Sequence, residues 1–493
     1  MGTPLRRHEK IVLLLVGIAF IALATYSCQK TQPENTNATP AVAASPAPAL
    51  PPWPQGFPQS MPSPVISGNI PRQVVINGNP ATPQDARPFF DNFSWESFIA
   101  LNWPAQSGAR GVPNDPNNPN VLFTAPNGAP VVWGTYKDSF DLFGQGNERP
   151  TAWNSPSKIF PCPGVTGDQK TLIFTTKGET PLMQSKEAFS FPLIDQRNNF
   201  VYFDIRYDEA QYSFIRGKDD DKTSWLYLLT NLAPKENAQF GVQMPMTTTS
   251  ALGSIMVKAA WRIGTSSDDP KRYYAINAQI YNSQTKTCTP STVLLVGLHI
   301  AHKVDPFSEW VWSTFEQVDN VPPDPDVSPK PSPPPNGYSF NNGKNDPPAP
   351  NGYNYKPQLT APGTPTPTPS PVQVTRVNAI PNTPQGQSTR DINLYYQTAL
   401  RGTVWQYYQL VVTQWPANPG VGAGKPFMLM QKGGVYPQNA GAAFPAFGAV
   451  NTTMETYFQT QNDAAGAGGN SCMSCHYRAG QSDFSWGLNR RAH

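Results

Sequence analysis

The sequence predicts a mainly β protein with a few short helices and a C-terminal segment of helix and loop. Short stretches in which aromatic and β-branched residues alternate with polar residues recur along the chain, separated by clusters of Gly, Pro, Asn and Asp, which is the pattern of strands joined by turns. Charged residues make up 14% of the chain and aromatic residues 11%. Typical soluble proteins have about 25% charged residues. The aromatic content suits a β-rich exported protein or a flat hydrophobic cofactor pocket.

Residues 1–28 have the features of an export signal. Arg6, Arg7 and Lys10 precede an apolar run of 14 residues over 11–24, which is short for a membrane span and has the length of a signal-peptide core. Cys28 follows at a position where bacterial lipoproteins carry a lipidated cysteine. Cleavage after Ala24 and retention of the segment as an anchor are the alternatives. We expect an exported, periplasmic protein that a lipid or an N-terminal anchor tethers to a membrane.

Two proline-rich stretches divide the rest of the chain. Residues 29–60 contain mainly Pro, Ala, Thr, Asn and Gln with almost no apolar periodicity, which predicts a disordered tether. Residues 61–493 then form one β-rich domain. A second stretch at 320–373 has the same bias and is predicted to be a disordered insertion into this domain, because it cannot bury enough apolar surface to order itself.

Six segments of the domain read as strands because they are rich in aromatic and β-branched residues. They are residues 200–207, 254–263, 273–281, 291–300, 310–318 and 404–415. A helix is predicted over 94–102, with Ser94 as its N-cap and Pro104 just beyond its end. A second short helix is predicted over 452–459.

The most specific motif is Cys472-Met473-Ser474-Cys475-His476, a C-x-x-C-H sequence. This spacing lets both thiols join one edge of a haem while the adjacent histidine binds the iron, and it is the attachment signature of one covalent haem c. The chain has no second cysteine pair to complete a zinc site, and no strand–helix context supports a thioredoxin-like dithiol. We therefore expect Cys472, Cys475 and His476 to hold a haem in an attachment segment over 451–493.

The second axial ligand of the iron would decide the chemistry, because a closed position suits an electron carrier and an open one admits small ligands. His299 and His302 end a strongly apolar strand, and residues three apart on a strand face opposite ways. One of them is a candidate distal ligand, with His299 preferred and His302 as the alternative. Both could instead be structural. Met428, Met430 and Met454 are the rival ligands, although methionine more often fills cores.

Two further cysteines are candidates for a disulfide. Cys162 and Cys288 remain once Cys28 is assigned to lipid and the two motif cysteines to haem, and their proline- and threonine-rich flanks read as loops. An oxidising compartment would favour a bridge between them. Two unpaired thiols are the alternative.

Taken together, these motifs resemble those of large mono-haem bacterial proteins of the cytochrome c family. The stretches that carry the resemblance are residues 95–104, 297–300, 310–320, 405–416, 451–452, 455–456 and 471–476. The resemblance implies an exported, haem c-bearing protein that transfers electrons, and it implies no specific activity. In position only, the motif also resembles that of the cytochromes c′ and their β-sheet counterparts, which often have five-coordinate haem.

We therefore expect an exported mono-haem c-type cytochrome that carries electrons in the periplasm and exchanges them with a redox partner protein that the sequence does not identify. The alternative is a haem enzyme or gas-binding protein with five-coordinate iron, of the peroxidase or NO- and CO-binding kind. The net charge of +3 gives no indication of a nucleic-acid partner.

Overall fold

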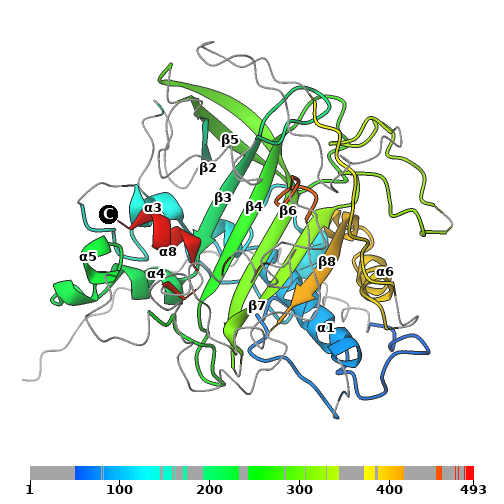
Figure 1. Ribbon diagram of the computed structural model, residues 1–493, viewed down its shortest axis with the longest axis horizontal. Coiled ribbons are helices and arrows are strands. Elements are labelled where there is room, and N and C mark those ends of the chain that lie inside the picture. The colour runs from blue at the N-terminus through cyan, green and yellow to red at the C-terminus, as the bar shows by residue number, and fades with distance from the viewer. Residues whose placement is uncertain are drawn as a thin grey trace, which may run out of the picture. The chain divides into compact units, whose positions relative to one another are not determined.

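The computed structural model describes residues 50–78, 80, 83–144, 148–157, 162, 170–174, 192–232, 242–282, 285–305, 307–328, 330–343, 371–382, 387–415, 451–457, 472, 476, 482–483 and 485–492. Eight strands in these ranges form one sheet (Figure 1). They are β1 (Lys137–Asp138), β2 (Lys170–Phe174), β3 (Val201–Tyr207), β4 (Ile255–Ile263), β5 (Ala275–Asn282), β6 (Thr287–Val304), β7 (Phe307–Gln317) and β8 (Tyr408–Gln414). The mainly β fold and all six predicted strands are confirmed, with shifted ends.

The 18-residue strand β6 organises the sheet. It pairs with β4 on one side, while on its other side the first half pairs with β5 and the second half with β7. The sheet continues from β4 to β3 and β1, and from β7 to β8. All pairings are antiparallel except that of β2 with β5. The central strands are buried along most of their length, which is why their sequences are nearly continuous apolar runs.

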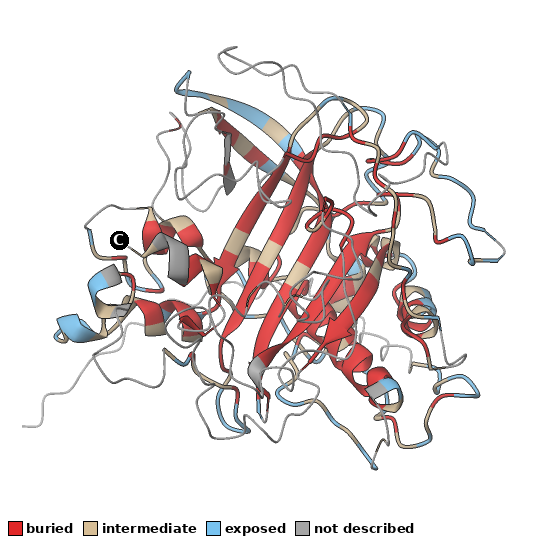
Figure 2. Ribbon diagram, viewed as in Figure 1, coloured by how far each residue is buried: buried red, intermediate tan, exposed pale blue. Residues whose placement is uncertain are grey.

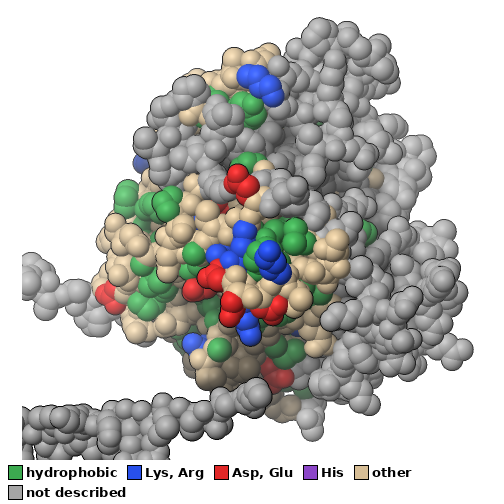
Figure 3. Space-filling model, turned by 90° about the vertical axis from the view of Figure 1, so that its left-hand side faces the viewer, with side chains coloured by type: hydrophobic (Ala, Val, Ile, Leu, Met, Phe, Trp, Pro, Cys, Tyr) green, Lys and Arg blue, Asp and Glu red, His purple; other side chains and the backbone are tan. Residues whose placement is uncertain are grey.

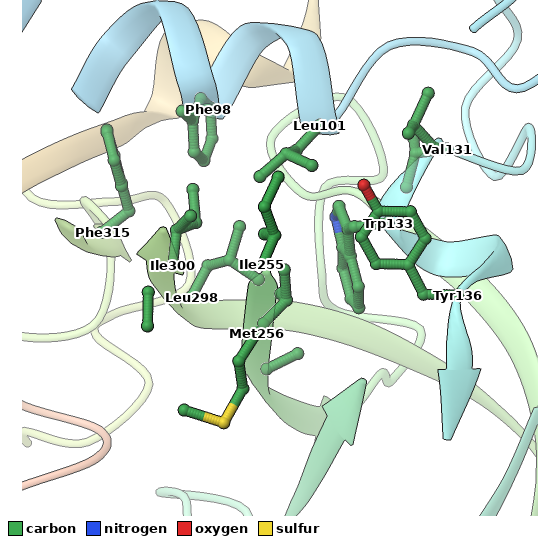
Figure 4. Packing of buried hydrophobic residues seen from close by; sticks show 14 of the residues in the cluster. Phe98, Leu101, Val131, Trp133, Tyr136, Ile255, Met256, Leu298, Ile300 and Phe315 are labelled. Carbon is green, nitrogen blue, oxygen red and sulfur yellow. The ribbon is translucent and has the colours of Figure 1, made fainter. Parts of the chain in front are cut away.

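The helix α1 (Pro83–Leu101) packs on one face of the sheet, and this face is called the α1 face below. Phe98 stacks on Phe315 of β7 with ring centroids 4.3 Å apart. In Figure 4, Phe98 and Leu101 lie over Leu298 and Ile300, whereas Met256 of β4 points away from α1.

The predicted start of this helix at Ser94 is wrong, because α1 begins eleven residues earlier and contains Pro88. Ser94 is fully buried inside the helix, and its hydroxyl lies 2.7 Å from the hydroxyl oxygens of both Ser313 and Thr413. A serine that looks like an N-cap therefore joins the helix to β7 and β8. Proline fits the first turn of a helix, so Pro83 marks the actual start.

Several short helices and 3-10 turns surround the sheet. They are α2 (Asn120–Thr124), η1 (Trp133–Thr135), α3 (Ser139–Phe143), α4 (Glu209–Arg216), η2 (Lys222–Ser224), α5 (Leu229–Leu232), α6 (Thr389–Ala399), η3 (Val404–Tyr407) and α8 (Trp486–Arg491). Of the helix predicted over 452–459, residues 452–457 form turns and a bend instead, and 458–459 lie outside the described residues. None of the helices in the described ranges combines the length and the apolar character needed to cross a membrane.

Both proline-rich stretches contain residues packed into the domain, which differs from the expected disorder. In the predicted tether 29–60, Phe57 is buried and Trp53 packs on Tyr395 with ring centroids 4.4 Å apart. In the predicted insertion 320–373, Phe340 and Val372 are buried in an apolar cluster beside the sheet. A few large apolar side chains thus fix segments whose average composition is that of a linker. Residues 29–49 and 344–370 lie outside the described ranges.

The end of the sheet that carries α3, α4 and α5 presents acidic and basic side chains side by side (Figure 3). Asp219 pairs there with Arg149 and, at 2.9 Å, with Arg216. The guanidinium of Arg149 also lies 4.7 Å from the ring centroid of Trp225. Opposite charges on this surface are therefore paired locally.

Candidate functional site

The two described residues of the C-x-x-C-H motif lie against β7 and β8. The backbone N–H of Cys472 donates to the side-chain oxygen of Gln414, the last residue of β8, at 2.7 Å. The imidazole of His476 packs on the indole of Trp312 in β7, with ring centroids 4.4 Å apart and an interplanar angle of 52°. Both motif residues are half-buried. Residues 473–475, which include Cys475, lie outside the described residues.

Strand alternation assigns these contacts to the face of the sheet opposite α1. Ser313 and Phe315 contact α1, so Trp312 and Thr314 point to the other side. Trp312 is paired with Ala301 of β6, and Thr314 with His299. Paired residues in an antiparallel ladder share a face, so His299 lies on the same face as Trp312. This side of the sheet is called the motif face below.

One row of side chains on the motif face is partly open. Ile205, Lys258 and His299 are direct neighbours across β3, β4 and β6, and each is half-buried although nearly all residues around them are buried (Figure 2). The next row contains Met256, Ala301, Trp312 and Gln414, which are paired in that order. The row that meets the motif and the partly open row are thus adjacent, with a spacing of about 7 Å along the strands.

His299 faces a carboxylate from the segment 451–457. Its Nε2 lies 3.5 Å from Oε2 of Glu455, and the side chains are 12% and 22% exposed. This distance is too long for a good hydrogen bond, and Nε2 makes none with any described residue. Burial alone would raise the pKa of Glu455, but the neighbouring side chains of His299 and Lys258 and the backbone N–H of Asn451 keep it below its usual range. Glu455 is therefore an ionised neighbour of the imidazole at neutral pH.

His302 occupies the α1 face, so the two histidines are separated by the sheet. It is 1% exposed, its ring packs on that of Phe93 in α1 with centroids 5.6 Å apart and an interplanar angle of 27°, and its Nε2 is 2.9 Å from the hydroxyl of Thr247. Burial lowers the pKa of His302 to about 3, so the ring is neutral. His302 therefore has a structural role, which was one of the two alternatives for each histidine.

The other predicted residues have different outcomes. Cys162 and Cys288 form a disulfide with Cα atoms 5.6 Å apart. Met454 is buried in the apolar cluster with Phe203 and Val296. Cys28, Met428 and Met430 lie outside the described residues.

The sequence analysis did not predict the buried ion pair and hydrogen bonds through which Asp483 joins the C-terminal segment to the sheet. Asp483 pairs with Lys303 of β6, accepts the backbone N–H of Met244 at 2.6 Å, and through its carbonyl accepts the indole N–H of Trp310 at 3.1 Å. Burial raises the pKa of Asp483, and the Lys303 ammonium opposes this shift. The sequence does contain one indication of this contact. Lys303 lies just beyond the apolar part of β6, and a lysine that is buried needs a counter-ion.

No protein-family model, no curated protein and no solved structure matches this chain. Among the residues that the structure describes, no group of three or more His, Cys, Asp or Glu side chains is arranged to hold a metal ion by itself. A haem needs a different set, because the porphyrin supplies four ligands and the protein one or two.

Proposed function

We propose that this protein is an exported c-type cytochrome that carries one haem c and transfers electrons. Cys472 and Cys475 attach the haem, and His476 is the proximal ligand of its iron. The observation that carries the proposal is the C-x-x-C-H motif. It is supported by the contacts of Cys472 and His476 with a sheet face that has a mainly apolar row and, beside it, the partly open row of Ile205, Lys258 and His299.

The residues on the motif face suit a haem. Trp312, Met256 and Ala301 form an apolar row beside His476 that the chain buries, which is the kind of environment a porphyrin prefers. Trp312 fixes the orientation of the His476 ring, and Gln414 fixes the backbone at Cys472. When bound, the haem supplies a one-electron redox centre whose potential depends on its ligands and on burial. The strands β7 and β8 would orient the haem through these contacts and exclude water from its buried side.

The export signal supports a periplasmic location, with Cys28 or the N-terminal apolar segment as the membrane tether. The electron donor or acceptor would be another redox protein that approaches the tethered domain.

A second candidate function is a haem enzyme or gas-binding protein with five-coordinate iron. The specific observation that favours it is the exposure of Glu455 and His299, at 22% and 12%, on a face whose other residues are mostly buried. A polar pair that keeps contact with solvent beside the motif gives small molecules a route of approach.

The cysteine variants test the attachment. In a host that matures c-type cytochromes, Cys472→Ala and Cys475→Ala each leave the haem joined by one thioether at most, which shifts the absorption band of the reduced protein in alkaline pyridine. Ser474→Ala in the same motif is the matched control and keeps the wild-type band. Normal two-thioether attachment in both cysteine variants would refute the proposal.

Addition of CO to the reduced wild-type protein separates the two candidate functions. An electron carrier with both axial positions filled keeps its spectrum, whereas a five-coordinate protein binds CO and its main absorption band shifts. Rapid CO binding would contradict the electron-carrier function and favour the haem enzyme or gas-binding protein.

A further inference from the structure

We infer that His299 is the second axial ligand of the iron and that Glu455 is the acceptor that orients its imidazole. This inference rests on the proposed function, since it names the residues on the far side of the same haem. It identifies one of the two candidate histidines and adds a carboxylate that sequence reasoning did not consider.

The first step is that only one of these histidines shares a face with the motif. His299 is paired with Thr314, and Trp312, which contacts His476, is paired with the next residue on that face of β6. His299 and Trp312 are therefore diagonal neighbours, at about 7–8 Å. Residues of the motif and His299 can contact one group that lies over the two rows.

Nε2 of His299 faces the carboxylate of Glu455 at 3.5 Å, which is too long for a good hydrogen bond. Nε2 makes no hydrogen bond with any described residue, although the atom is buried. A buried imidazole nitrogen whose polar neighbour is a carboxylate at 3.5 Å is only weakly satisfied, and this calls for an explanation. A ring that coordinates the iron through its other nitrogen would keep Nε2–H for donation to Glu455.

The carboxylate of Glu455 is positioned to orient the His299 ring. Histidine ligands of metals commonly donate their second ring N–H to a carboxylate, which fixes the tautomer and strengthens the ligand. Glu455 lies 3.5 Å from the ring, and its own position is fixed because it accepts the backbone N–H of Asn451 at 2.9 Å. Asn451 in turn donates its side-chain N–H to the carbonyl of Phe315 in β7 at 2.8 Å.

The chain provides an internal control in His302. Its ring is enclosed by Phe93 and Thr247 on the α1 face, and coordination there would require removal of the helix from the sheet. Met454 is the sulfur rival on the motif face, and it is 1% exposed within an apolar cluster. It has the environment of core filler.

Haem-loaded His299→Ala, His299→Gln and His302→Asn test the inference. Covalent attachment is measured first, by intact mass after denaturation, so that failure of the proposed function is recognised separately. We expect all three to keep the haem. Both His299 variants should change from a low-spin to a high-spin ferric spectrum and should bind CO after reduction. His302→Asn should keep the wild-type spectrum and lose only stability. Unchanged low-spin spectra in both His299 variants would overturn the inference.

Two further measurements do not depend on the folding of those variants. Near-infrared magnetic circular dichroism of the wild-type ferric protein distinguishes two nitrogen ligands from a nitrogen and a sulfur. We expect two nitrogens, and a sulfur ligand or a five-coordinate iron would overturn the inference.

Glu455→Gln should stay low-spin but raise the reduction potential, because a neutral amide withdraws less of the imidazole proton. An unchanged reduction potential would contradict the role of Glu455 as the acceptor that orients the imidazole.

Discussion

The two faces of the sheet use neighbouring residues of the same strands in different ways. On the α1 face, aromatic rings and hydroxyl groups are fully enclosed, and His302 is neutral between Phe93 and Thr247. On the motif face, His299 sits three residues earlier in β6 and is partly open beside an ionised carboxylate. β6 therefore places one histidine in a core and the other on a partly open row, and strand alternation makes this division.

The faces also differ in how they treat charge. Asp91 on the α1 face is bound by the hydroxyls of Thr389 and Thr413, and burial raises its pKa to about 6. The motif face instead holds full ion pairs, such as Glu316 with Arg376. Hydroxyl donors leave the pKa of the buried Asp91 raised, whereas an ion pair places a counter-ion directly against the carboxylate of Glu316.

Truncation on the α1 face should have the largest effect on stability. Phe98→Ala removes a fully buried ring that packs on Phe315, and the cavity should lower the free energy of unfolding by about 4 kcal/mol. Lys258→Ala on the partly open row is the comparison, with an expected change below about 1 kcal/mol. Denaturant unfolding of both proteins measures the difference. Equal losses would mean that the two faces are closed to the same extent.

Loss of a buried cation on the motif face should come next. Arg376→Met leaves the carboxylate of Glu316 buried and without its arginine partner, at a cost of about 3 kcal/mol. Glu316→Gln added to that variant should restore part of the stability, because the remaining side chain is neutral. A double variant that is less stable than Arg376→Met alone would contradict this account of the ion pair.

The pH dependence of stability should reveal the neutral state of His302. Its pKa is about 3 in the folded protein against the ordinary 6.5, so unfolding takes up a proton below pH 6.5 and stability is lost as the pH falls. Between pH 7 and pH 5 this group should contribute a loss of about 2 kcal/mol, which His302→Asn removes. Identical pH profiles of variant and wild type, from thermal unfolding at each pH, would show that the ring is not enclosed.

Glu96 of α1 should show a smaller effect with the opposite sign. Burial raises its pKa from 4.5 to about 7, so the folded state holds a proton that the unfolded state releases. Stability is therefore lost as the pH rises through this window, by about 1.5 kcal/mol after allowance for partial exposure. Glu96→Gln keeps a side chain that can contact Asn92 and should flatten this part of the curve. A steeper curve would contradict a raised pKa.

The sequence was sufficient for features that depend on local pattern. The strands over 200–207 and 254–263 were found because they are rich in aromatic and β-branched residues, and the C-x-x-C-H motif because its spacing is chemical. The start of α1 was missed because Pro88 and Ser94 each suggest a boundary, and tertiary packing overrides both. The helix α6 was also missed, although Ser388 and Asp391 form a capping box at its start.

The arrangement around the motif could not be predicted because it depends on register. Nothing in the local sequence indicates that Trp312 meets His476, or that Glu455 meets His299, since these pairs are more than 150 residues apart in the chain. The sequence did predict that His299 and His302 face opposite ways. The face of each became clear only when β6 was paired with β7 and covered by α1.

The mass of the denatured wild-type protein, matured in a periplasm that makes c-type cytochromes, tests the central claim most directly. The account predicts a polypeptide that retains the mass of one haem after extraction with acid and acetone, and that locates this mass on the peptide containing Cys472 and Cys475. A polypeptide that is exported and folded but carries two unmodified thiols at these positions would contradict it.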